Sequence, residues 1–84
     1  MKYEVVWKDA AEEDLARLWT DAADRDAVTR AAAEIDRLLA RDPWGSGESR
    51  SGGFRVTFVE PLGVTYRIDE AANAVRIARA FTLG

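Results

Sequence analysis

Three arginines are the residues of this sequence best suited to bind another molecule. Arg55, Arg67 and Arg76 each lie in a segment where apolar and polar residues alternate, and each occupies the polar phase. Alternation places successive side chains on opposite faces of a strand, and the planar guanidinium fork suits carboxylates and phosphates. If the segments are neighbouring strands, the arginines form one basic patch on the outer face of a sheet. A solvated face without a partner would carry the same pattern.

Two further candidates lie in residues 43–53, where glycine and serine predict a loop. Trp44 stands beside glycines, where it either anchors a partner or closes the loop, and Arg50 adds a charge to the same stretch. Arg79 differs from these because it follows the apolar phase of the last strand. That phase points it toward the helices and predicts an ion pair with a carboxylate such as Asp14.

The chemistry that the sequence lacks is equally informative. There is no histidine and no cysteine, so the usual general base at neutral pH, thiolate nucleophiles and Cys-type zinc sites are all excluded. The acidic run Glu12, Glu13 and Asp14 is explained by the dipole of a helix N-terminus. No glycine motif precedes a helix in the manner of a phosphate-binding loop. We therefore predict no catalytic residue, no metal site and no cofactor.

Size and charge narrow the class of protein. The 84 residues predict one domain, 1–84, with a small core and a thin stability margin. The net charge of −3 argues against a protein that neutralises many phosphates, and no sequence-specific DNA binding is expected. No apolar run reaches the length of a membrane span, and the N-terminus has no signal-peptide core. These features predict a cytoplasmic protein.

The elements that must position these side chains follow from periodicity. Residues 3–7 read as a strand, and two helices follow, the first capped by Asp9 and the second ending before Pro43. After the loop, residues 54–59, 64–69 and 75–81 alternate as three strands joined by short turns. The order β-α-α-β-β-β predicts an α+β fold in which a helical hairpin packs on one face of a mainly antiparallel sheet.

The periodicity of each segment indicates which aromatic residues are buried. Most fall on positions that predict burial in the core rather than stacking on a ligand, and both tyrosines are also placed for the core. The residues expected in the core on this basis are Trp7, Trp19, Phe54, Phe58, Phe81, Tyr3 and Tyr66.

Several of these segments, taken in order, resemble the RelE/ParE toxin superfamily. The similarity spans nearly the whole chain, and no single motif is specific alone. It rests on residues 3–19, on the helix carrying Ile35, Leu38 and Leu39, on the Asp42-Pro43 break, on Arg55, on residues 64–69 and on residues 75–77.

The resemblance implies a bacterial type II toxin–antitoxin (plasmid stabilisation) system. RelE-like members cleave mRNA on the ribosome, ParE-like members inhibit DNA gyrase, and a cognate antitoxin wraps and silences both. This sequence departs from the nucleases: Thr57 and Gly63 stand where they carry basic residues, and residues 80–84 leave no basic tail. The resemblance therefore favours a ParE-like binder. The alternatives are a RelE-like endonuclease and a non-toxic interaction module.

Overall fold

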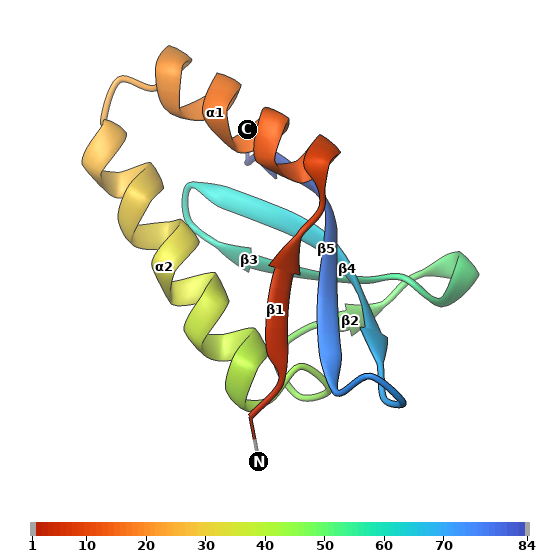
Figure 1. The fold of residues 1–84 in the computed structure, drawn as a ribbon. Coiled ribbons are helices and arrows are strands. Elements are labelled where there is room, and N and C mark those ends of the chain that lie inside the picture. The colour runs from red at the N-terminus through yellow and green to blue at the C-terminus, as the bar shows by residue number, and fades with distance from the viewer. Residues whose placement is uncertain (1, 84) are drawn as a thin grey trace.

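The computed structural model describes residues 2–83, and Figure 1 shows how their elements are arranged. The predicted order of strand, two helices and three strands is confirmed. A two-residue strand and a short 3-10 turn, η1, lie within the predicted loop. Met1 and Gly84, the ends of the predicted domain, lie outside the described residues. The elements are β1 (Glu4–Trp7), α1 (Asp9–Asp21), α2 (Arg25–Arg41), β2 (Glu48–Ser49), η1 (Ser51–Gly53), β3 (Arg55–Val59), β4 (Leu62–Asp69) and β5 (Ala74–Thr82).

The helix boundaries follow from capping and from proline. Asp24 caps α2 by accepting a hydrogen bond from the Ala27 amide at 3.1 Å, and α2 ends just before the Asp42-Pro43 pair, as predicted. The predicted cap of α1 is wrong: Asp9 is already helical, and Lys8 holds the cap position without a side-chain hydrogen bond. No helix within residues 2–83 is both long and apolar enough to cross a membrane.

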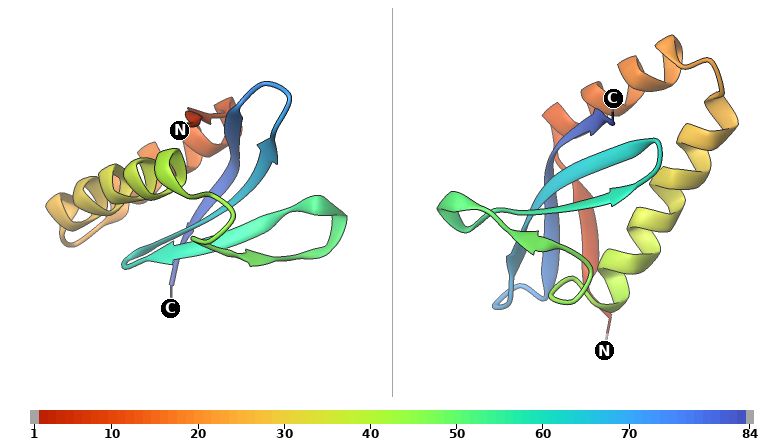
Figure 2. Two further views of the ribbon diagram at one scale, coloured as in Figure 1. Left: turned by 90° about the horizontal axis from the view of Figure 1, so that it is seen from below. Right: turned by 180° about the vertical axis from the view of Figure 1, so that it is seen from behind.

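The strands form one mixed sheet in the order β1-β5-β4-β3-β2. β1 pairs with β5 in parallel, and the remaining neighbours are antiparallel. Figure 2 shows the helical hairpin gathered on one side of the strands, so the other side of the sheet carries no helix. The predicted α+β architecture is thereby confirmed.

The core lies between the two helices and the central strands, and α1 contributes the fully buried Ala11. Tyr66 is fully buried, as predicted, and its hydroxyl donates to the Pro43 carbonyl at 2.8 Å, which ties β4 to the end of α2. Tyr3 is only half-buried. The fully packed apolar residues come from both layers: Val28, Ala31, Ile35 and Leu39 from α2, and Leu62, Val64, Tyr66, Val75 and Ile77 from β4 and β5.

In strand β3 the side chains point to the opposite faces of the sheet from those predicted. Arg55 lies opposite the buried Tyr66 and Thr57 lies opposite the buried Val64, so both point to the helix side of the sheet. Phe58 therefore points to the outer side, and 47% of it is exposed. Thr57 is tolerated inside because its hydroxyl donates to the Ser46 carbonyl at 2.6 Å.

An irregularity in the pairing of β4 with β5 switches the faces to which the side chains in the second half of β5 point. Ile77 pairs with Tyr66, whereas Arg79 pairs with Thr65, so one extra residue is accommodated between them. Phe81 consequently moves to the outer face rather than into the core. Trp19 on α1 is also outside the core, with 42% exposure.

Candidate partner-binding face

The side of the sheet without helices forms the candidate site. Figure 2 shows this side uncovered, and we call it the open sheet face. Strand register and the contact between Arg67 and Phe54 place its residues together. The open sheet face comprises Val6, Phe54, Phe58, Gly63, Arg67, Arg76 and Phe81.

Two of the predicted arginines meet at one end of this face. Arg67 and Arg76 are direct cross-strand partners, as the alternation predicted. Arg76 forms an ion pair with Asp69 at 2.6 Å, and this hydrogen bond lowers the pKa of the Asp69 carboxyl. Arg67 instead lies 4.5 Å from the Phe54 ring centroid and donates to the Gly52 carbonyl. Only one of the two guanidiniums is thus neutralised by a carboxylate within residues 2–83.

A hollow of about 620 Å³ lies beside these arginines. Its lining combines three cationic side chains and two aromatic rings with two carboxylates, Asp69 and Glu70. The guanidiniums suit acidic groups of a partner, and the rings suit cationic or aromatic ones. We call this region the arginine end of the face. The residues that line it include Lys8, Trp44, Phe54, Arg67, Glu70 and Arg76.

Trp44 closes the loop, which is one of the two roles that the sequence left open, and it stays a candidate for partner contact. Its indole nitrogen donates to Glu70, which ties the loop to the turn after β4, yet 52% of the residue is exposed. Glu70 also accepts from the Tyr3 hydroxyl at 3.0 Å, and this hydrogen bond raises the pKa of Tyr3. The tryptophan is therefore held in place while leaving much of its surface free for contact.

Arg55 does not join the other two arginines. Its Nη2 donates to the Trp44 and Gly47 carbonyls, both at 2.7 Å, and its Nη1 donates to the Ser49 hydroxyl at 3.0 Å. The guanidinium carbon lies 5.4 Å from the Trp44 ring centroid. The expectation that Arg55 shares an exposed face with Arg67 and Arg76 is wrong, because the phase of β3 turns it into the loop.

Arg50 makes only local polar contacts. Its Nη1 pairs with Glu48 at 3.2 Å and donates to the Ser49 carbonyl at 3.0 Å. Both charged side chains of this pair are well exposed, so it contributes little to stability. Arg50 stays a candidate for partner contact.

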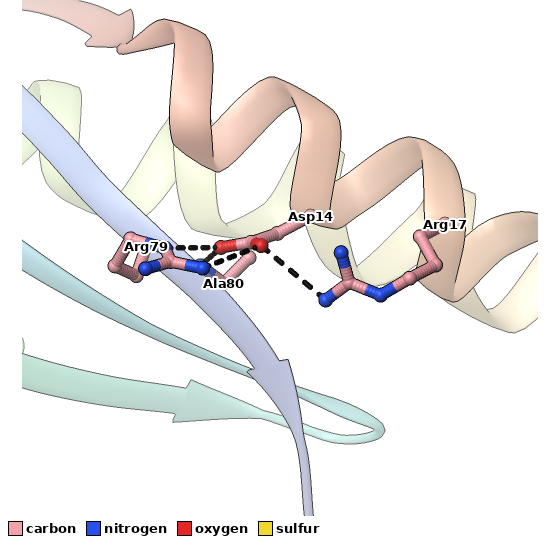
Figure 3. Close-up of polar contacts among 4 residues, drawn as sticks. All are labelled: Asp14, Arg17, Arg79 and Ala80. Atoms are coloured by element: carbon pink, nitrogen blue, oxygen red, sulfur yellow. Dashed lines mark hydrogen bonds and ion pairs between the residues drawn. The ribbon is translucent and has the colours of Figure 1, made fainter.

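The predicted ion pair between Arg79 and Asp14 is confirmed (Figure 3). Arg79 donates through Nε at 2.7 Å and through Nη2 at 3.0 Å, and Arg17 adds a third contact at 3.3 Å. The Ala80 amide also donates to Asp14 at 3.0 Å, because β1 ends at Trp7 and leaves this part of the β5 edge without a strand partner. The pKa of the buried Asp14 carboxyl lies far below its usual range, chiefly because of the Arg79 hydrogen bonds and then the Ala80 amide.

The opposite end of the open sheet face is aromatic. Phe58 and Phe81 pack edge to face, with ring centroids 6.0 Å apart, over Gly63 between them. A Cβ built on Gly63 would lie 2.5 Å from the Phe81 ring and 2.9 Å from Phe58. We call these three residues the aromatic end. Sequence reasoning missed it, although a glycine inside an alternating strand is a signal for a closely packed neighbour.

We expect Gly63→Ala to destabilise the protein by about 1–3 kcal/mol, because the added methyl forces both rings to move. Urea unfolding measures the difference. In a Phe81→Ala background the same change should cost clearly less, since the closest ring is gone. Equal costs in the two backgrounds would show that the rings do not set the requirement for glycine.

Within residues 2–83, no group of three or more carboxylates is arranged to hold a metal ion. The one fully buried tyrosine hydroxyl is engaged with a backbone carbonyl. The hollow at the arginine end presents guanidinium groups, an ammonium group, aromatic rings and two carboxylates. Of these carboxylates, Asp69 accepts from Arg76, and Glu70 accepts from Trp44 and Tyr3.

Comparison with known proteins supports the fold. No protein-family model matches the sequence, and no curated protein matches it. Among solved structures, a chain of the RelBE2 toxin–antitoxin complex from Mycobacterium tuberculosis aligns with a TM-score of 0.83 and 22% identity, over 99% of this chain and 93% of that one.

Two further structures agree. A chain of the chromosomal ParDE toxin–antitoxin system from Pseudomonas aeruginosa aligns with a TM-score of 0.75 and 17% identity, over 99% of this chain and 98% of that one. A chain of the archaeal RelE–RelB complex from Pyrococcus horikoshii aligns with a TM-score of 0.70 and 15% identity, over 100% of this chain and 98% of that one. The chain therefore has the RelE/ParE toxin fold, as the resemblance predicted.

Proposed function

We propose that this chain is the toxin of a bacterial type II toxin–antitoxin system that acts in the cytoplasm and is neutralised by a cognate antitoxin. The observation that carries the proposal is the RelE/ParE fold over essentially the whole chain, with an open sheet face that bears exposed cationic and aromatic groups. The similar structures are toxin–antitoxin complexes or come from such systems.

Binding, rather than RNA cleavage, is the mode of action that the geometry favours. Cleavage requires one group to activate the 2′-oxygen and another to protonate the leaving oxygen. Arginine stays protonated and cannot serve as the base. The carboxylates at the arginine end are already engaged, Asp69 by Arg76 and Glu70 by Trp44 and Tyr3. Tyr66 is buried and hydrogen-bonded, and the pKa of Tyr3 is raised by Glu70, which makes its hydroxyl a poorer base. These features support a ParE-like toxin that docks on a protein, and DNA gyrase is the target implied by the resemblance.

Two assays run in parallel separate this proposal from its alternatives. We expect the purified protein to inhibit DNA gyrase in a supercoiling assay, and Arg67→Ala combined with Arg76→Ala to weaken inhibition. Arg37→Ala is the matched control, because Arg37 is an exposed arginine on α2, paired with Glu34. In a ribosome-programmed translation assay followed by primer extension, we expect no cleavage of mRNA. Codon-specific cuts that disappear with Arg67→Ala would instead establish the nuclease, and inactivity in both assays would favour a non-toxic module.

A further inference from the structure

The aromatic end of the open sheet face exposes apolar surface at a defined place. Phe58 is 47% exposed. Because Gly63 has no side chain, the two rings lie directly on the backbone of β4. Aromatic side chains held this rigidly lose little conformational entropy on binding, which makes them effective anchors.

Two exposed guanidiniums lie near this apolar surface. The Asp14 carboxylate forms ion pairs with both Arg17 and Arg79, whose side chains are 59% and 64% exposed. Arg79 lies two residues before Phe81 on β5, and its guanidinium reaches Asp14 across the strand edge (Figure 3). Glu13 also attracts Arg79 electrostatically, yet both guanidiniums stay largely exposed, so carboxylates of an occupant can still pair with them.

The adjoining edge of β3 is available for an extended chain. β2 pairs only with Arg55 and Val56, so within residues 2–83 no strand flanks Phe58 and Val59 on that side. Unpaired strand edges readily accept an added strand. This geometry suits an extended polypeptide better than a small apolar molecule.

We propose that the aromatic end is the docking site for an extended segment of the antitoxin, in which an apolar side chain sits against Phe58 and Phe81 and neighbouring Asp or Glu residues face Arg17 and Arg79. This inference rests on the proposed function for the identity of its occupant. An antitoxin is favoured because a segment bound here covers the same open sheet face that carries Arg67 and Arg76. Occupying that face is what neutralisation of a target-binding surface requires.

The test uses the product of the adjacent gene, both as the full-length protein and as overlapping synthetic peptides that tile it. Binding to the intact chain is measured by fluorescence anisotropy. We expect one peptide with an apolar residue next to carboxylates to bind. We also expect Phe58→Ser to lower the affinity of the chain for the full-length product at least about tenfold. Phe58→Leu should lose less affinity than Phe58→Ser, and Arg17→Gln should reduce the salt dependence of binding. Trp19→Ser, which removes a comparably exposed aromatic residue from α1, should leave affinity unchanged.

The outcomes separate the two claims. If the full-length product binds and Phe58→Ser binds equally well, the docking site is wrong while the proposed function stands. If Phe58→Ser and Trp19→Ser weaken binding equally, the effect is not specific to the aromatic end, and the docking site is again wrong. If the product does not bind the unmodified chain at all, both the antitoxin and its docking site are rejected.

Discussion

Replacing Asp14 by alanine is expected to destabilise this protein by about 2 kcal/mol, because the buried Ala80 amide loses its acceptor and two arginines lose their shared carboxylate. For a domain of this size that corresponds to a melting temperature lower by roughly 8–16 °C. The exposed arginines themselves contribute little, since water can replace the carboxylate around them. Circular dichroism during thermal unfolding measures the change.

Two variants serve as controls for this prediction. Asp14→Asn keeps an oxygen that can accept from the Ala80 amide, so its loss should be smaller than that of Asp14→Ala. Arg17→Ala removes only the longest of the contacts to Asp14 and should cost less than about 0.5 kcal/mol. If Asp14→Ala melts no lower than Arg17→Ala, the carboxylate does not hold α1 to β5.

The same carboxylate makes stability depend on pH with a defined sign. The pKa of Asp14 in the folded protein lies well below its usual value of 3.8, so folding is favoured when this group is ionised. Its contribution is fully present above the unfolded-state pKa and is lost as the pH falls below about 4. The melting temperature of the unmodified chain should therefore drop more steeply on acidification than that of Asp14→Asn.

Replacing Arg55 by alanine is expected to cost about 1.5–3 kcal/mol, because the loop after α2 loses hydrogen bonds from a charged donor to Trp44, Gly47 and Ser49. Arg55→Lys should restore little, since an ammonium group lacks the planar fork that reaches these acceptors together. Urea unfolding and limited proteolysis of residues 43–53 are the appropriate measurements.

Arg67→Ala is the comparison for this second prediction. Arg67 is exposed and contacts a ring and one carbonyl, so its removal should change stability by less than about 1 kcal/mol. If Arg67→Ala destabilises the protein as much as Arg55→Ala does, the claim that Arg55 is structural and Arg67 is a surface residue is wrong.

The order of elements and most of the core were predictable from the sequence because periodicity, capping and proline agree. The α2 stripe through Val28, Ile35 and Leu39 and the inner phase of β4 are examples. The phase of β3 was predicted wrongly, because its alternation favours burying Phe54, Val56 and Phe58, whereas the structure turns Arg55 and Thr57 to the helix side. This orientation depends on carbonyl acceptors that the preceding loop supplies to Arg55 and Thr57, and the alternation pattern of the strand does not report them.

The candidate site was predictable only in part for the same reason. Arg67 and Arg76 lie on strands of regular alternation and meet as expected. The aromatic end arises from an extra residue in β5 and from packing over Gly63, and neither follows from local pattern. Long-range register, rather than residue type, decides which side chains share the open sheet face.

The central claim, that this chain is a toxin held by a cognate antitoxin, is tested most directly by thermal melting with and without the purified product of the adjacent gene. A partner that binds only the folded form at about 100 times its dissociation constant adds about 2.7 kcal/mol, which raises the melting temperature of a domain of this size by roughly 11–22 °C. We predict such a rise, together with a complex on gel filtration. An unchanged melting temperature at saturating concentration, with no complex, would contradict the account.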